Sequence, residues 1–480
     1  MRFCNDILGG LVMAGLAVAD FPIAKFRNVV YFDQYHTTTL PDKSVTGGIT
    51  HVVMAFANSS LFAPGTAGPY EPFKPVKDVR AMFDDNAKVG IAIGGWGDLA
   101  GFSAGAATPE SRTTYAHNVA KMAADHGFDF VDIDWEYPGG NGADYKQIPN
   151  ENKTCEITSF PLFLQEIKNA IAPKPLSIAV PALAHDMIAY TPAQSAAIFN
   201  AVDMVNLMSY DMITRRDNAT LHHSSVTGSL ESAKRYIDLG LPAYKLNLGI
   251  AYYAKYFQTP EGVTCNEPVG CPIVKGENDD GSDAGTSGAI TFEQANLHPP
   301  AALTNLTDTP DGSCGAGTSF GCSGPKAEGN CCSTAGFCGA TPAHCGLGCQ
   351  GNFGKCPGAD ITTLFNKALE NGKVDEKEGG MWYWDSEARV FWTWDTPELI
   401  NRKFTDVLQP LGLGGVMAWS MGEDSADWSH VKAVSDVAKK ARAPLGIEIG
   451  TEIGLNKRHA HNERDLRARI EKPHGRLFAL

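Results

Sequence analysis

The chain has 480 residues, enough for two or three average domains or for one large α/β barrel with additions. Its 54 acidic residues outnumber the 40 Lys and Arg residues, which gives a formal net charge of −14 at pH 7. This charge disfavours functions that depend on broad attraction to nucleic acid or to anionic membranes, so we expect neither as a partner.

The first 19 residues have the pattern of a secretion signal. Arg2 precedes an apolar run from Ile7 to Ala17, and Ala17-Val-Ala19 forms a small-x-small cleavage site. The apolar run is shorter than the ~20 residues that a membrane-spanning helix needs, which disfavours a membrane anchor. We therefore expect a secreted, extracellular protein. Sequons for N-glycosylation, whose occupancy the sequence leaves open, begin at Asn58, Asn152, Asn218 and Asn305.

Short β-rich runs then alternate with helical stretches, a pattern that predicts a parallel sheet. The runs lie at 28–32, 51–57, 88–93, 128–133, 176–180, 204–208 and 245–250. An eighth run, 415–419, follows only after a gap of roughly 165 residues, which is too long for one helix and one loop. The sequence therefore predicts an insertion between the seventh and eighth strands.

The fourth run carries an unusual row of acids, Asp132, Asp134 and Glu136, on an otherwise apolar segment. Because strand side chains alternate between faces, these acids share one face, with Cα atoms about 7 Å apart. A solvated edge strand is the alternative, but such strands usually mix acids with Lys, Thr or Ser. Crowded carboxylates cannot all ionise cheaply, so we expect a raised pKa and a protonated acid suited to general-acid catalysis.

The motif Asp129-x-x-Asp132-x-Asp134-x-Glu136, followed by Tyr-Pro, resembles the catalytic signature of the family-18 glycoside hydrolases, the chitinase family of class V type. The resemblance covers most of residues 26–440 and implies an α/β fold, a (β/α)8 TIM barrel with Glu136 at the mouth. It implies a monomeric secreted chitinase that binds chitin and chitooligosaccharides. A non-catalytic chitin-binding lectin and an endo-β-N-acetylglucosaminidase acting on glycoprotein glycans remain as alternatives.

The mechanism implied by the resemblance is substrate-assisted retention. Glu136 protonates the glycosidic oxygen while the substrate's own acetamido oxygen attacks the anomeric carbon. Asp134 orients the acetamido group, and Asp132 lies behind Asp134. Neither a metal nor an organic cofactor is implied. Asp129 has the opposite side-chain parity and is interpreted as structural.

Three further stretches resemble the family. Met208-Ser-Tyr210-Asp211 corresponds to its Met-x-Tyr-Asp, and Trp419 to the tryptophan beneath the cleaved sugar. Ala92-Ile-Gly-Gly-Trp96 resembles its Ser-x-Gly-Gly and a tryptophan that stacks the sugar on the leaving-group side, but Ala92 replaces the serine that normally contacts the acid at Asp132. The resemblance implies the catalytic residues Glu136, Asp134, Asp132 and Tyr210 and the substrate-binding residues Trp96, Met208, Asp211, Trp419, Tyr137 and Tyr31, of which Tyr31 is a candidate partner for Asp132.

The resemblance also implies a domain division. A small α+β domain occupies the long gap and forms one wall of the substrate groove, with 288–292 and 381–394 as its first and last parts. The expected segments are a signal peptide at 1–19, barrel strands one to seven at 26–255, the α+β insertion at 256–395, strand eight and the last helices at 396–442, and a tail at 443–480 that is interpreted as solvated, with disorder left open.

Eight of the twelve cysteines lie between Cys314 and Cys356, among Gly, Ser and Ala. So small a segment needs cross-links, and the adjacent pair Cys331-Cys332 is not a zinc-ligand spacing, so disulfides are favoured over zinc. Eight cysteines allow 105 pairings, among which arithmetic cannot choose. Outside this segment, Cys265 and Cys271 are close enough to pair, and Cys155 has no evident partner.

Residues 313–357 resemble a hevein-like chitin-binding module, which implies the pairs Cys314–Cys332, Cys322–Cys338, Cys331–Cys345 and Cys349–Cys356. Its sugar-binding positions correspond to Ser333, Ala335, Phe337 and His344. With only one clear aromatic among them, weakened chitin binding and a purely structural disulfide knob both remain open. The acidic loop 277–283 lacks EF-hand spacing and is interpreted as solvated rather than as a calcium site.

Overall fold

The computed structural model describes residues 26–293, 297, 305–315, 318–358 and 360–442. The predicted signal peptide at 1–19 and the predicted tail at 443–480 lie outside these described residues. Within them, every helix is too short or too polar to traverse a bilayer.

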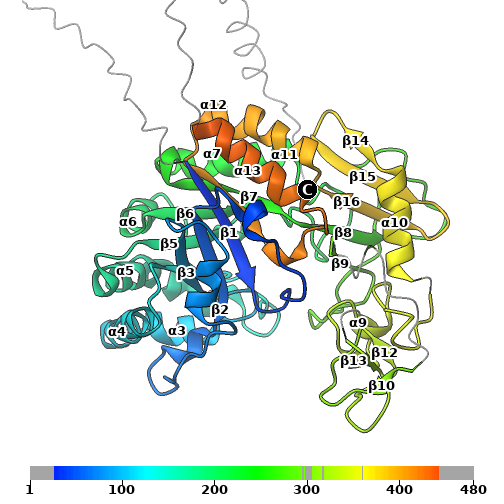
Figure 1. Cartoon of the computed structure of the whole chain (residues 1–480), viewed down its shortest axis with the longest axis horizontal. Coiled ribbons are helices and arrows are strands. Elements are labelled where there is room, and N and C mark those ends of the chain that lie inside the picture. The colour runs from blue at the N-terminus through cyan, green and yellow to red at the C-terminus, as the bar shows by residue number, and fades with distance from the viewer. Residues whose placement is uncertain (1–25, 294–296, 298–304, 316–317, 359, 443–480) are drawn as a thin grey trace, which may run out of the picture. The chain divides into compact units, whose positions relative to one another are not determined.

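Eight parallel strands close into a barrel in the order β1-β17-β7-β6-β5-β4-β3-β2 (Figure 1). Each corresponds to one of the eight predicted runs, so the predicted (β/α)8 barrel is confirmed. The barrel strands are β1 Arg27–Asp33, β2 His51–Ala57, β3 Lys88–Gly94, β4 Phe130–Asp134, β5 Leu176–Pro181, β6 Met204–Met208, β7 Leu246–Ala251 and β17 Gly415–Trp419.

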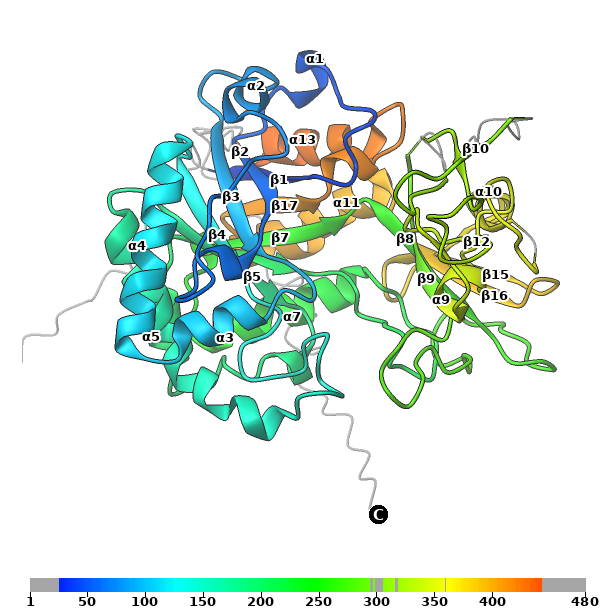
Figure 2. The ribbon, with the colours of Figure 1, turned by 90° about the horizontal axis from the view of Figure 1, so that it is seen from below.

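Helices cover the outside of the barrel, and Figure 2 shows α3, α4 and α5 beside the strands that they connect. Their ends follow local sequence signals. The Thr108 hydroxyl caps α4 ahead of Pro109, and Gly127, with a φ of 72°, follows its last turn in a left-handed conformation that glycine adopts readily. The helices are α1 Lys43–Thr46, α2 Val76–Ala81, α3 Ala100–Ala106, α4 Pro109–Asp125, α5 Thr154–Ile171, α6 Ser195–Ala201, α7 Val226–Asp238, α11 Pro397–Lys403, α12 Gln409–Leu411 and α13 Ser429–Arg442.

Two layers of apolar side chains hold the barrel together. The larger lies between strands and helices and includes Val131, Ile133 and Trp135, the residues that alternate with the acids of β4. The smaller fills the barrel interior around Tyr31, Ala92 and other inward residues. The alternation along β4 thus directs the acids to the interior and their neighbours to the helices.

The insertion forms an antiparallel sheet in the order β14-β15-β16-β8-β9, with α10 beside it (Figure 1). It begins at Tyr253, three residues before the predicted boundary, because only Tyr252 separates β7 from β8. Its core includes Trp392 stacked on Phe365, with ring centroids 5.3 Å apart. Its elements are β8 Tyr253–Gln258, β9 Ser287–Thr291, α10 Ile361–Asn371, β14 Lys373–Asp375, β15 Gly380–Asp385 and β16 Val390–Trp394.

The cysteine-rich segment, taken with the residues just ahead of it from 305, contains two small strand pairs and one helical turn, and its four disulfides have the pairing that the hevein resemblance implies. Cys265 and Cys271 also pair, whereas Cys155 is free and exposed. The Leu347 amide donates to the Gly285 carbonyl at 2.9 Å, which attaches this segment to the insertion. Its elements are β10 Thr307–Asp308, β11 Phe320–Gly321, β12 Cys331–Cys332, β13 Cys338–Gly339 and α9 Pro342–Cys345.

Candidate active site

A cavity of about 620 Å³ opens at the carboxyl ends of the barrel strands and reaches the insertion. Of the predicted catalytic and substrate-binding residues, all except Asp132 line it. Asp132 is fully buried in the barrel beneath the cavity. The structure therefore gathers residues from β1, β3, β4, β6 and β17 into one site, at the end of a barrel where active sites are expected.

Asp132 is held by three side chains from three other strands. The Tyr31 hydroxyl donates to Oδ2 at 2.8 Å, and the Ser177 hydroxyl and the Asn206 amide donate to Oδ1 at 2.5 and 3.2 Å. Ser177 and Asn206 were absent from the predicted site. Both are polar residues inside runs that read as buried strands, and this is the signal that could have identified them.

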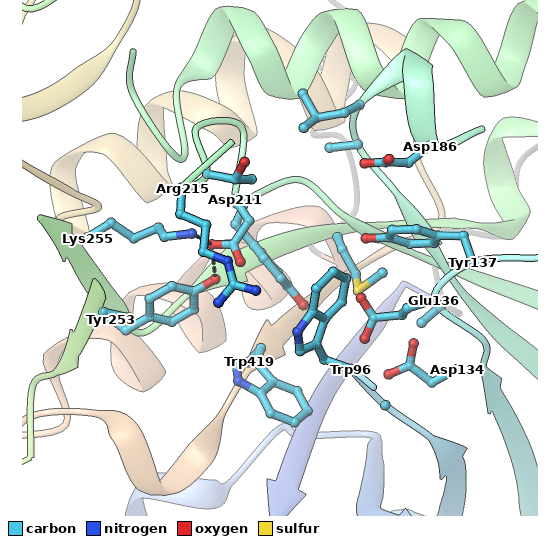
Figure 3. A pocket seen from close by; sticks show the side chains of 18 of the residues that line it. Trp96, Asp134, Glu136, Tyr137, Asp186, Asp211, Arg215, Tyr253, Lys255 and Trp419 are labelled. Carbon is cyan, nitrogen blue, oxygen red and sulfur yellow. Dashed lines mark hydrogen bonds and ion pairs between the residues drawn. The ribbon is translucent and has the colours of Figure 1, made fainter. Parts of the chain in front are cut away.

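Asp134 and Glu136 lie next to each other on one side of the cavity (Figure 3). Both are at least nine-tenths buried, and Asp134 Oδ1 has no hydrogen-bond partner among the described residues. An unpaired carboxylate oxygen beside a cavity is available to accept a hydrogen bond from a bound molecule.

Burial is the largest cause of the raised pKa values in the acid row. It raises the pKa of Asp132 to about 6 despite the hydrogen bonds that lower it. It also raises the pKa of Asp134, with a further contribution from the charges of Glu136 and Asp132. For Glu136, burial raises the pKa and the charges of Asp211 and Asp186 add to it. The raised values are as expected, but desolvation contributes more than the crowding that the spacing suggested.

Asp211 follows β6 and faces the acid row from across the cavity (Figure 3). The Tyr253 hydroxyl donates to its Oδ1 at 2.7 Å, and Lys255 Nζ lies 3.0 Å from the same oxygen. Desolvation would raise the pKa of Asp211, but the Lys255 ammonium, the nearby His223 imidazole and the Tyr253 hydrogen bond hold it well below its usual value. Asp211 is therefore an ionised acceptor at neutral pH.

Aromatic rings form the floor and one rim of the cavity. Trp419 stacks on Phe56, with centroids 5.4 Å apart, and also contacts Tyr31. Trp96 is 53% exposed and lies near Tyr137. Flat apolar rings of this kind suit the faces of pyranose sugars. The sequence did not identify several other lining residues, among them Tyr35, Phe56, Asp186, Arg216, Tyr253 and Lys255.

Two groups of described residues have the spacing of metal ligands, and neither suits a metal. Cys314, Cys322 and Cys332 are all in disulfides. The second group is Asp33, His36 and Glu423, in which Asp33 already accepts hydrogen bonds on both oxygens, from His36 and Ser420. Thiolates and free carboxylate lone pairs are the ligands that a metal would need.

The hevein-like segment presents only part of its predicted binding surface. Phe337 is 57% exposed. Ser333 is buried, and its hydroxyl accepts from the Phe337 amide at 3.2 Å and donates to the Phe337 carbonyl at 3.1 Å. His344 bonds Thr341 through Nδ1 at 2.7 Å. The Ser333 hydroxyl therefore shapes the loop that presents Phe337.

Residues 27–424 match the family model of the glycosyl hydrolases of family 18. Chitinase 1 of Aphanocladium album is 28% identical over 277 residues, and endochitinase 1 of Metarhizium robertsii is 31% identical over 282 residues. Each alignment covers 50% of this chain and 63% of the relative, so the chain spans less than two thirds of either relative's length.

Solved structures share the fold at low sequence identity. Catalytic domain 2 of the group II chitinase of Ostrinia furnacalis aligns with a TM-score of 0.58 at 17% identity, over 87% of this chain and 97% of that one. A chitinase-like agglutinin of Robinia pseudoacacia aligns with a TM-score of 0.55 at 18% identity, over 86% of this chain and 99% of that one. The same barrel thus occurs in proteins described as a chitinase and as an agglutinin.

Proposed function

The chain belongs to family 18 of the glycosyl hydrolases, and from this premise we propose that it is a chitinase cleaving β-1,4-N-acetylglucosamine linkages with the help of the substrate's own acetamido group. The observation that carries the proposal is the pair Glu136 and Asp134, buried together at the wall of a cavity with an aromatic floor. The raised pKa of Glu136 favours the protonated form that a general acid needs.

In the first step, Glu136 donates its proton to the glycosidic oxygen, and the bond between that oxygen and the anomeric carbon breaks. The acetamido oxygen attacks the same carbon, which forms a cyclic oxazolinium ion. Asp134 Oδ1, unpaired among the described residues, accepts the acetamido N–H and stabilises the developing positive charge.

In the second step, water attacks the anomeric carbon and opens the ring. Glu136, now ionised, takes a proton from this water and returns to its starting state. The anomeric configuration is retained because the carbon has been attacked twice from opposite faces. Every proton in this cycle is carried by this chain, the substrate or water.

The remaining side chains hold the sugars. Trp419 supports the sugar at which cleavage occurs, and Tyr210 donates its hydroxyl to the acetamido oxygen. Asp211 accepts hydroxyls of the neighbouring sugar, and Trp96 stacks the sugar on the leaving-group side. The exposed ring of Phe337 provides an additional contact with solid chitin. The five disulfides of the described residues support an extracellular site of action, since such bonds persist in oxidising compartments.

The test incubates the purified protein with chitin hexaose and follows the product lengths, with Glu136→Gln as the matched control. We expect short oligomers from the wild type and a loss of at least about a hundredfold in the variant, since a general acid contributes 10²–10⁴ in rate. Equal product from both proteins would remove Glu136 from the mechanism. Binding of hexaose without cleavage by the wild type would instead favour a lectin.

A further inference from the structure

A bridge of side chains crosses between the barrel loops and the insertion on one side of the cavity. Its centre is Glu277, which is 5% exposed, so the prediction that loop 277–283 is merely solvated is wrong for this residue. The Tyr145 hydroxyl donates to Glu277 Oε2 at 2.5 Å, and Arg215 Nε donates to Oε1 at 2.8 Å. Three loops, from β4, β6 and the insertion, therefore meet at one carboxylate.

Arg216 joins this bridge to the cavity. Its Nε lies 3.5 Å from Glu277 Oε1, and its Nη1 and Nη2 donate to the carbonyls of Asn141 and Gly142 at 2.9 and 3.1 Å. Its guanidinium carbon lies 4.0 Å from the ring centroid of Tyr145. With these contacts on its edges and on the ring of Tyr145, the planar group has little freedom to rotate.

Trp96 is a further partner of this guanidinium. The guanidinium carbon of Arg216 lies over its ring, 5.6 Å from the centroid. Trp96 is half exposed, follows the glycines Gly94 and Gly95, and has Tyr137 as its other ring neighbour, 6.4 Å away. A cation–π contact of this kind favours one orientation of an indole that is otherwise half exposed on a glycine-rich turn.

We propose that Arg216 is a positioning residue that holds Trp96 in the orientation needed to stack the sugar on the leaving-group side. This inference rests on the proposed function, because it assigns Trp96 to a sugar subsite. The affinity of that subsite for sugar then depends on the contacts that Glu277, Tyr145 and Arg216 make between the insertion and the barrel loops. Arg216 takes no part in the proposed bond-breaking steps, and its proposed effect on the sugar passes through Trp96.

The test is a double-mutant cycle with Trp96→Ala and Arg216→Lys, measured on chitin hexaose. Lys keeps the charge but cannot bond two carbonyls in one plane and still lie flat on a ring. We expect Arg216→Lys to raise KM roughly two- to tenfold with a smaller change in kcat. In the Trp96→Ala background the same substitution should have little further effect, because the ring that it positions is gone.

The matched control is Arg402→Lys, which alters an arginine of α11 that pairs with Glu376 and Asp406 away from the cavity. Arg216→Lys should reduce the hydrolysis of an aryl chitobioside, whose leaving group is not a sugar, by a smaller factor than the hydrolysis of hexaose. Two results would contradict the positioning role of Arg216: effects on hexaose hydrolysis that multiply fully in the double variant, or equal losses of activity on hexaose and on the aryl chitobioside. If Arg216→Lys fails to fold, Arg216→Gln takes its place in the same cycle.

Hexaose binding in the Glu136→Gln background, followed by tryptophan fluorescence, separates this inference from the proposed function. If the wild type does not cleave hexaose, the proposed function fails. Losses of hexaose affinity that are coupled between Arg216 and Trp96 would still support the positioning role of Arg216. If the wild type cleaves hexaose and the substitutions at Arg216 and Trp96 act independently, only the positioning role of Arg216 is contradicted.

Discussion

At the scale of single residues, the acid beneath the cavity keeps its hydrogen bonds although one expected partner is missing. Ala92 is paired in register with Asp132 and offers no hydroxyl. Ser177, in register on the other side of Asp132, supplies the hydroxyl instead, and Tyr31 bonds the second oxygen. A serine hydroxyl therefore still donates to Asp132, but it comes from β5 instead of β3.

Ser177→Ala should move the acid limb of the kcat/KM profile to higher pH. Burial raises the pKa of Asp132 to about 6, and the Ser177 hydrogen bond opposes this rise. Without that bond the pKa rises further, by about one unit for a hydrogen bond to a charged group. Asp132 then ionises only at higher pH, and so does the pair that it forms with Asp134. Hydrolysis of chitin hexaose between pH 4 and 8 measures the shift.

Ala92→Ser in the Ser177→Ala background should move the acid limb back, because it restores a hydroxyl beside Asp132 on the neighbouring strand. The control is Ser229→Ala, which removes a buried hydroxyl of α7 that has no partner among the described residues. An acid limb that does not move in Ser177→Ala would show that Asp132 does not set it.

At the scale of elements, a partly buried charge cluster joins the carboxyl ends of β1 and β17. His36 Nδ1 lies 2.9 Å from Asp33 Oδ1 and 3.5 Å from Glu423 Oε1, and its Nε2 lies 3.9 Å from Glu293 of the insertion. The Ser420 hydroxyl, next to Trp419, donates to Asp33 Oδ2. The cluster therefore fixes the strand end that carries the cavity floor.

His36→Gln should lower the melting temperature at pH 6 and lose this effect above pH 9. Burial alone would lower the pKa of His36, but the Asp33 hydrogen bond and the charges of Glu423, Asp33 and Glu293 raise it to about 9. A raised pKa stabilises the fold when the group is protonated. The contribution is complete below the unfolded value of about 6.5 and disappears as the pH rises through about 9. Thermal unfolding of both proteins from pH 6 to 10 tests this, and a constant gap would contradict it.

At the scale of the whole molecule, the junction between insertion and barrel contains a buried ion pair. Lys403 on α11 contacts Asp395, which follows β16, and both side chains are fully buried. Ser224, ahead of α7, donates to Asp395 Oδ2 at 2.8 Å and accepts from Lys403 at 2.7 Å. The junction is therefore held by charge as well as by apolar packing.

Lys403→Met should lower the free energy of unfolding by about 3–5 kcal/mol, because it leaves the Asp395 carboxylate buried without its counter-ion. Chemical denaturation followed by tryptophan fluorescence measures the change. The double variant Lys403→Met, Asp395→Leu should recover part of the loss, since it removes both charges. A double variant less stable than Lys403→Met would contradict this account.

The sequence predicted the barrel because its signals are local: eight apolar runs, capped helices and an acid row of period two. The motif residues of the candidate site were identified as well, and all of them except Asp132 line the cavity, since they lie at strand ends that the fold brings together. Ser177, Asn206 and Arg216 were missed because their roles depend on register and on loop contacts between distant segments. Burial of Glu277 was missed for the same reason, since an acidic loop reads as solvated until its arginine partners are known.

The hevein-like segment offers the whole enzyme an aromatic surface for solid chitin outside the cavity. Deleting it is a poor test, because Leu347 packs on the insertion core and the segment bonds Gly285 beside the cavity. Phe337→Ala changes only the exposed ring. We expect it to weaken adsorption to insoluble chitin severalfold, as about 1 kcal/mol of lost stacking would.

Hydrolysis of solid chitin should fall by a larger factor than hydrolysis of hexaose, because only a solid surface can engage a site outside the cavity. Pull-down with chitin beads and rates on both substrates measure this, with Val374→Ala, an exposed apolar residue of β14, as the control. Equal losses of activity on the two substrates would indicate that the segment has a structural role and does not bind chitin.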